Sequence, residues 1–109
     1  MLDVETSHFE DGKKSRDGRA EYAGILYRLI FNDLVYVVRR YDESDEAAFL
    51  RATNAAGEDV LGPDIPYDDP RFAEAVRYLM ETLGVKKPKV LLSGGYAYVD
   101  LGRVGGPRS

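Results

Sequence analysis

Tyrosine, arginine and carboxylate side chains are the groups in this sequence that could take part in chemistry. Tyr96, Tyr98 and Asp100 alternate in the segment GGYAYVDL, so a strand there would place all three on one face. Four tyrosines on a sheet, Tyr27, Tyr36, Tyr96 and Tyr98, could hold a small aromatic ligand or the bases of single-stranded nucleic acid, and Arg28, Arg39 and Arg40 could then meet its phosphates. Because tyrosine is also a good strand former and no binding motif accompanies it, we weigh a core or interface role above ligand binding.

Catalytic and metal-binding motifs are missing from the sequence. His8 is the one histidine and there is no cysteine, which excludes a thiolate nucleophile and a Cys-based zinc site and leaves a catalytic base hard to assemble. Carboxylates gather at 42–46, but a calcium loop counted from Asp42 would need glycine where Ala47 stands. We therefore predict no catalytic residue, no metal and no cofactor. An enzyme would need a carboxylate with a raised pKa in an apolar pocket, for which Asp100 and Asp33 are the candidates.

Two apolar segments around a tight turn predict a β-hairpin. Residues 22–31 and 34–41 are rich in Ile, Val, Leu and Tyr, and Asn32 and Asp33 between them suit a two-residue turn. One face of this hairpin is nearly all apolar: Ile25, Tyr27, Leu29, Phe31, Leu34, Tyr36, Val38 and Arg40. The other face mixes aliphatic, aromatic and cationic side chains and is the predicted interface: Leu26, Arg28, Ile30, Val35, Val37, Arg39 and Tyr41.

The segment DPRFAEAVRYLMETLG predicts an amphipathic helix. Asp69 offers an N-cap oxygen, Pro70 suits the first helical position, and Gly84 can take the left-handed conformation that ends a helix. The large apolar side chains share one stripe: Phe72, Val76, Leu79, Met80 and Leu83. This helix can therefore pack against a sheet along one side.

The remaining segments predict further strands. Residues 47–53 could form a helix or a strand, and we favour a strand because a turn at 54–57 and a short return strand at 58–61 follow it. The segment KPKVLLSGGYAYVDL predicts a second hairpin that turns at Gly94 and Gly95. That hairpin would have Tyr96 on a polar face and Val99 on a core face.

These elements predict an α+β fold, in which one amphipathic helix packs on a mainly antiparallel sheet of about four to six strands with two hairpins. We place a single domain at 21–101. Residues 1–20 mix both charges with few apolar residues, which predicts a flexible N-terminal arm; the alternative is an edge strand that uses Val4 and Phe9. Residues 102–109 are rich in glycine and predict a flexible C-terminal tail.

Composition limits the partners. The 109 residues carry a net charge of -4, which argues against nucleic acid and anionic membranes because both are usually bound by a surplus of Lys and Arg. The longest apolar run, LVYVV, is far too short to span a membrane. We therefore expect no membrane span and a cytoplasmic location.

The predicted interface leads to a functional hypothesis. One helix covers one face of a sheet, and aliphatic residues framed by Arg and Tyr are typical of protein interfaces. The sequence therefore predicts a non-enzymatic protein–protein interaction module that forms a homodimer or binds another protein. Two alternatives stay open: the N-terminal arm or the segment after Tyr41 folds back over this face, or a Tyr/Arg face of the sheet binds a small aromatic ligand or single-stranded nucleic acid.

Overall fold

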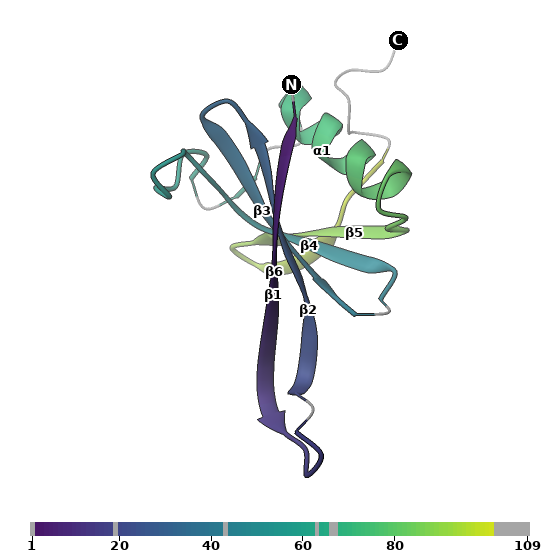
Figure 1. Cartoon of the computed structure of the whole chain (residues 1–109). Coiled ribbons are helices and arrows are strands. Elements are labelled where there is room, and N and C mark those ends of the chain that lie inside the picture. The colour runs from purple at the N-terminus through teal and green to yellow at the C-terminus, as the bar shows by residue number, and fades with distance from the viewer. Residues whose placement is uncertain (1, 19, 43, 63, 66–67, 102–109) are drawn as a thin grey trace.

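A computed structural model describes residues 2–18, 20–42, 44–62, 64–65 and 68–101. These residues form one mostly antiparallel sheet and one helix, which confirms the predicted α+β fold (Figure 1). The elements in chain order are β1 (Asp3–Lys14), β2 (Ala20–Phe31), β3 (Leu34–Tyr41), β4 (Glu46–Thr53), α1 (Pro70–Glu81), β5 (Lys87–Leu92) and β6 (Gly95–Tyr98). The strands follow one another in the sheet in chain order, and only β4 and β5, which α1 connects, run parallel.

The first hairpin has the predicted register. Phe31 pairs with Leu34 across the turn, and Asn32 adopts the positive φ of 55° that this turn requires. The side of the sheet that faces α1 carries the apolar residues assigned to it, and six of them are buried: Tyr27, Leu29, Phe31, Leu34, Tyr36 and Val38. The alternation of the sequence therefore fixed which face of this hairpin is the core face.

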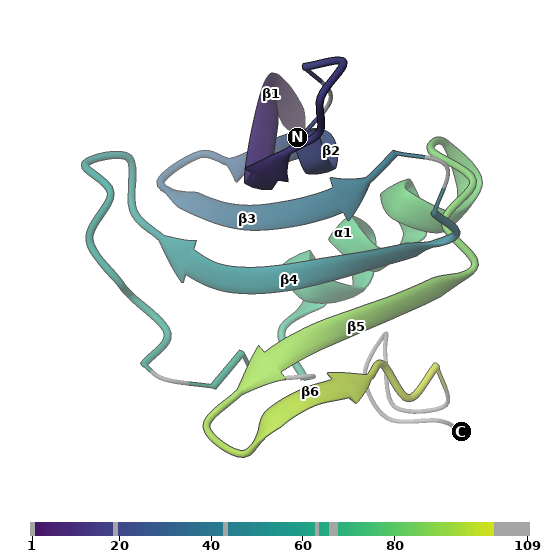
Figure 2. The same ribbon diagram turned by 90° about the horizontal axis from the view of Figure 1, so that it is seen from below.

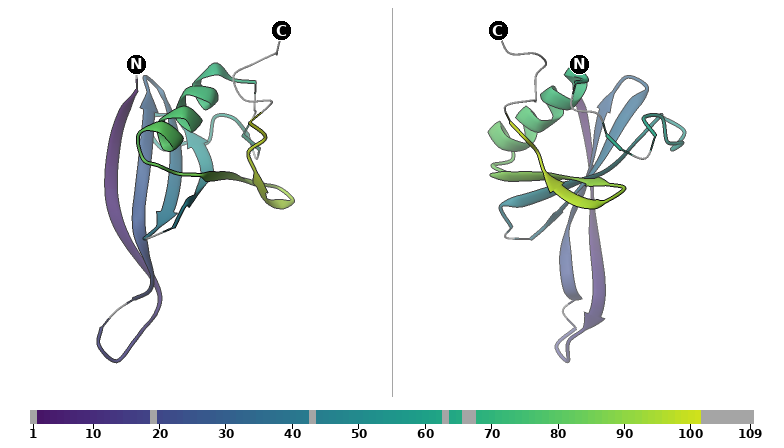
Figure 3. Two further views of the ribbon diagram at one scale, coloured as in Figure 1. Left: turned by 90° about the vertical axis from the view of Figure 1, so that its right-hand side faces the viewer. Right: turned by 180° about the vertical axis from the view of Figure 1, so that it is seen from behind.

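The helix lies along this face of the sheet in the left view of Figure 3. Its apolar stripe packs into the core cluster. Asp69 caps the helix by accepting a hydrogen bond from the Arg71 backbone N–H at 2.8 Å. Phe72 is fully buried against Tyr36 and Phe49, with ring centroids 5.9 Å and 4.9 Å away. Burying a large apolar side chain of this kind stabilises the fold by roughly 1.5–3 kcal/mol before entropy. The helix is thereby held across the middle strands.

The later elements follow the expectations with one difference. Residues 46–53 form a strand, as favoured, and β5 and β6 form the second hairpin, with Gly95 at a φ of 108°. The return strand expected at 58–61 is reduced to a single bridge between Thr53 and Asp59. Asn54 holds the preceding turn, because its side-chain oxygen accepts hydrogen bonds from the backbone N–H groups of Ala56 and Glu58.

The flexible N-terminal arm expected at residues 1–20 is wrong for most of its length, since Asp3–Lys14 forms the edge strand β1. Strand β1 pairs with β2 and supplies partners for the backbone groups along that side of β2. Leu2 and Val4 also pack against the core. The alternating charges of this segment hid the strand, because its outward side chains are polar. The expected C-terminal tail at 102–109 lies outside the described residues.

The β1–β2 hairpin is longer than the rest of the sheet. Gly24 pairs with Tyr41 at the end of β3, so residues 10–18 and 20–23 continue past the third strand as a two-stranded extension, which we call the ribbon. The ribbon projects from the body in Figures 1 and 3 and contributes to overall extents of 54 × 30 × 29 Å.

Gly24 lies where the ribbon leaves the sheet, and we predict that it tolerates no side chain. A Cβ atom there would lie 2.0 Å from the Arg40 carbonyl oxygen, so Gly24→Ala must push β2 away from β3. We expect a loss of about 1–3 kcal/mol in the free energy of unfolding, measured by urea denaturation. Gly94→Ala is the control, because a Cβ atom at Gly94 meets nothing within 4 Å. Equal stability of the two variants would contradict this prediction.

Candidate functional site on the open face of the sheet

The side of the sheet opposite α1, which we call the open face, carries one row of side chains across five strands. In register, Leu26 of β2 lies beside Arg39, followed by Ala48, Lys89 and Tyr98 of the next three strands. Figure 2 shows this side with α1 behind the sheet, and none of the described helices or strands lies over its middle. The open face is therefore the surface on which a binding site can be built.

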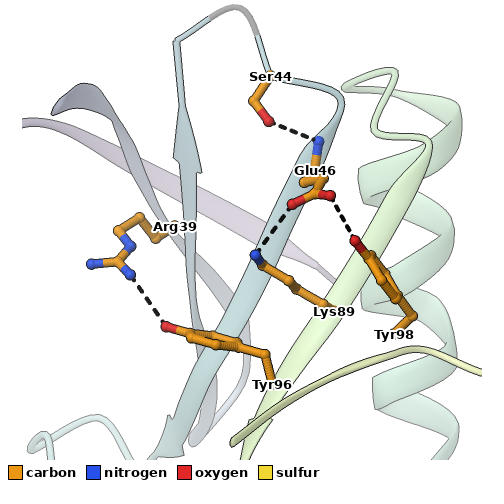
Figure 4. Close-up of polar contacts among 6 residues, drawn as sticks. All are labelled: Arg39, Ser44, Glu46, Lys89, Tyr96 and Tyr98. Atoms are coloured by element: carbon orange, nitrogen blue, oxygen red, sulfur yellow. Dashed lines mark hydrogen bonds and ion pairs between the residues drawn. The ribbon is translucent and has the colours of Figure 1, made fainter.

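Aromatic and cationic side chains gather at one part of the open face (Figure 4). The Arg39 Nη2 atom donates a hydrogen bond to the Tyr96 hydroxyl at 3.2 Å, and the Arg39 guanidinium lies 5.1 Å from the centroid of the Tyr41 ring. The Lys89 Nζ atom lies 4.8 Å from the centroid of the Tyr96 ring. Tyr96 thus contacts two cations, Arg39 through its hydroxyl and Lys89 through its ring. A cation–π contact such as that with Lys89 stabilises by roughly 0.5–1 kcal/mol at an exposed site.

These side chains frame a hollow of about 120 Å³. Its walls are Arg39, Tyr41, Lys89 and Tyr96, and Ala48 lies among them. Ala48 is only 4% exposed, although it lies on the open face, because the longer side chains around it cover it. A small residue at this place in the row leaves the space that a larger one would fill.

Glu46 neutralises one of the two cations. Its carboxylate accepts a hydrogen bond from the Tyr98 hydroxyl at 2.8 Å and pairs with Lys89 Nζ at 3.2 Å, while its backbone N–H donates to the Ser44 hydroxyl (Figure 4). The hydrogen bond from Tyr98 lowers the pKa of Glu46 most, and the hydrogen bond from Lys89 lowers it further. The hydrogen bond between Tyr98 and Glu46 also raises the pKa of Tyr98. Glu46 is thus ionised at neutral pH and Lys89 carries a paired charge.

Arg39 is the cation that lacks such a partner. Among the described residues, no carboxylate forms an ion pair with it. Its Nε atom is buried and finds no acceptor, although Nε and Nη2 lie on the same edge of the guanidinium, where a carboxylate can accept from both. The hollow therefore contains an arginine whose hydrogen-bonding capacity the described chain uses only in part, through the bond from Nη2 to Tyr96.

The structure corrects one part of the predicted interface. Val35 and Val37 lie on the open face as the register predicts, but they are only 1% and 8% exposed. Val37 is flanked in register by Arg28 and Arg51, so long side chains of neighbouring strands surround it. The aliphatic part of the face is therefore covered within the chain and presents little apolar surface to a partner. A lysine at either valine would bury a charge and cannot report on association.

The other predicted interface residues remain at least partly accessible. Leu26, Arg28, Ile30, Arg39 and Tyr41 are all half-buried. The Arg28 side chain forms an ion pair with Glu5 of β1, in which Arg28 Nη1 lies 2.6 Å from Glu5 Oε1. Strand β1, one of the segments that could have covered the face, thus extends the sheet sideways and contributes a charge partner at its edge.

Two of the three predicted ligand-binding residues belong to the site. Tyr96 and Tyr98 project from β6 onto the open face and are 49% and 61% exposed. Asp100 follows the end of β6 and is not among the residues that line the hollow. Sequence reasoning missed Glu46 and Lys89, because they meet through the parallel pairing of β4 with β5, which local alternation does not reveal.

A larger hollow of about 670 Å³ lies between the β2–β3 turn and the start of α1. Two of its charged side chains, Asp33 and Arg71, make contacts within the fold. Asp33, a candidate carboxylate for an enzyme, accepts a hydrogen bond from the Ala55 backbone N–H at 3.1 Å. Arg71 is paired with the helix cap Asp69 at 2.7 Å. Both carboxylates that line this hollow, Asp33 and Glu74, are exposed.

Within the described part of the chain, no group of three or more His, Cys, Asp or Glu side chains lies close enough to hold a metal ion. The described helix is too short and polar to cross a membrane. Comparisons with protein-family models, with curated proteins and with solved structures find no match for the chain.

The lowered pKa of Glu46 predicts how its contribution to stability depends on pH. Because the folded-state pKa lies below the ordinary value of 4.5, ionised Glu46 stabilises the fold at neutral pH, and this contribution is lost as the pH falls below 4.5 through the folded pKa. We expect Glu46→Gln to melt below the wild type at pH 7 and at the same temperature in strong acid, measured by circular dichroism. The exposed Glu81→Gln is the control. A melting difference that did not change with pH would contradict this account.

Proposed function

We propose that this chain is a non-enzymatic module that binds protein through the open face of its sheet and associates first with a second copy of itself. The observation that carries the proposal is the group of four exposed or half-buried side chains on the face that α1 leaves open: Arg39, Tyr41, Tyr96 and Tyr98. Tyrosine and arginine dominate the energetics of protein interfaces. These four residues therefore have the composition of an interface centre, although two of the aliphatic residues first assigned to that role, Val35 and Val37, are buried.

The polar contacts of this group support a binding role because they hold exposed side chains in place. Tyr98 is hydrogen-bonded to Glu46. Tyr96 is hydrogen-bonded to Arg39, and its ring lies against Lys89. Side chains that are already ordered lose less entropy when a partner binds, and this raises affinity. Self-association is the first partner we propose, since most soluble oligomers are symmetric homo-oligomers. The absence of cysteine fits a reducing compartment, and we propose the cytoplasm.

The hollow at Arg39 supports a second candidate function, which is binding of a small aromatic anion on the same face. Arg39 would meet the anionic group, and the rings of Tyr41 and Tyr96 would contact the aromatic part. Single-stranded nucleic acid is less well supported, because ionised Glu46 lies beside the hollow and the whole chain carries a charge of -4. A ligand with one negative charge matches the one cation that lacks a carboxylate.

We predict that substitutions in this group weaken self-association. Arg39→Gln and Tyr96→Ser should each raise the dimer dissociation constant by about tenfold or more, because each removes an interface-centre side chain. The measurement is sedimentation velocity over a range of concentrations. Arg77→Gln, at an exposed position of α1, is the matched control and should leave the dissociation constant unchanged. A wild-type chain that stays monomeric at every concentration would contradict self-association.

A further inference from the structure

Most of the ribbon lies beyond the third strand. At its base, the Asp42 backbone N–H donates a hydrogen bond to the Ala23 carbonyl oxygen and the Tyr22 ring lies against Tyr41. Farther out, the ribbon consists of two paired strands, and an isolated two-stranded hairpin is marginally stable in water. Its side chains on the open face include Tyr22, which is 50% exposed. A two-stranded extension that presents an aromatic residue to water gains stability when that residue packs against another surface.

The ribbon and the hollow have complementary chemistry. In the ribbon, Asp11 pairs with Tyr22, and both side chains lie on the same side of the sheet as the hollow. The Gly12 backbone N–H, 2.8 Å away, is the one described group that donates to the Asp11 carboxylate. The hollow has the opposite charge: its Arg39 guanidinium pairs with no carboxylate of the described residues, and beside it lies the exposed ring of Tyr96.

The two parts are also continuous on one molecule. The Tyr22 ring lies 5.6 Å from the Tyr41 ring, which in turn lies against Arg39. Phe9 also meets the Tyr41 ring at 5.6 Å, so an aromatic cluster joins the base of the ribbon to the wall of the hollow. Two copies related by a two-fold axis near this cluster would each bring a ribbon to the hollow of the other. Such an arrangement uses the same two surfaces twice and closes as a dimer.

We propose that the ribbon of one copy lies across the open face of a second copy, with the Asp11 carboxylate on the Arg39 guanidinium and the Tyr22 ring against Tyr96. The proposal rests on the self-association proposed above and names the two segments that carry it. Charge decides between occupants: in the part of the chain that the structure describes, Arg39 is the one cation of the hollow without a carboxylate partner, and the Asp11 carboxylate matches it one for one. A polyanion would meet ionised Glu46 at the same place.

Reciprocal charge substitutions test this contact. Asp11→Arg gives a chain whose ribbon and hollow are both positive, and Arg39→Asp gives one in which both are negative. Each variant alone should lose dimer, with a dissociation constant raised about tenfold or more. When the two variants are mixed, every ribbon meets a hollow of opposite charge, and the expected product is a one-to-one heterodimer, detected by native mass spectrometry.

A matched control separates this contact from a general effect of charge. Glu10→Arg makes the same charge change in the same strand, but its side chain lies on the opposite side of the sheet from Asp11. It should leave the homodimer intact. Thermal melting of each variant establishes that it is folded. If Arg39→Asp fails to fold, a double-mutant cycle of Asp11→Asn and Arg39→Gln takes its place, with an expected non-additive effect on the dissociation constant.

The outcomes separate the two proposals. A wild-type dimer that both Asp11→Arg and Arg39→Asp weaken, and that re-forms on mixing, supports the ribbon contact. A wild-type dimer that is insensitive to Asp11→Arg, or a mixture that gives no heterodimer, overturns the ribbon contact and leaves self-association through the open face standing. A wild-type chain that is monomeric throughout overturns both, and the hollow is then a site for a different occupant.

Discussion

The packing of one helix against one side of a curved sheet is the constraint on which the rest of the structure depends. The stripe of α1 that includes Phe72 and Leu79 buries the apolar side of β2, β3 and β4 and forms the core. A sheet has two sides, and the described chain contains a single helix to cover them. The side chains of the open face must therefore find their contacts with one another or with another molecule.

The open face meets this constraint differently at its two ends. Val35 and Val37 are buried within the chain, and Val37 lies in register between Arg28 and Arg51, so neither valine requires a partner. Around Ala48, the side chains are aromatic and charged, and a small residue leaves a hollow among them. Glu46, Lys89 and Tyr98 satisfy one another, whereas Arg39 keeps a buried N–H without an acceptor. A buried polar group without a hydrogen-bond partner, such as Arg39 Nε, is the feature that marks this part of the face as a candidate site.

The sequence predicted the parts of the fold that depend on local pattern. The Asn32–Asp33 turn set the register of the first hairpin, and Asp69, Pro70 and Gly84 marked the ends of the helical segment. Strand β1 was predicted only as the alternative to a flexible arm, because its charged side chains look like a solvated segment although they line a sheet edge. The candidate site was anticipated in part: Tyr96, Tyr98 and Arg39 were weighed as one binding face, and Tyr41 was assigned to the predicted interface. The parallel pairing of β4 with β5 brings them together, and no local pattern encodes that pairing.

The central claim is that the tyrosine and arginine side chains of the open face lie against another copy of the chain in solution. Hydroxyl-radical footprinting of the wild-type protein across a range of concentrations tests it most directly. The account predicts that oxidation of Tyr22, Tyr96 and Tyr98 falls together as the concentration rises, while oxidation of Tyr78, on α1 at the other side of the sheet, stays constant. Oxidation of the first three tyrosines that is independent of concentration, in a protein that sediments as a dimer, would contradict the account.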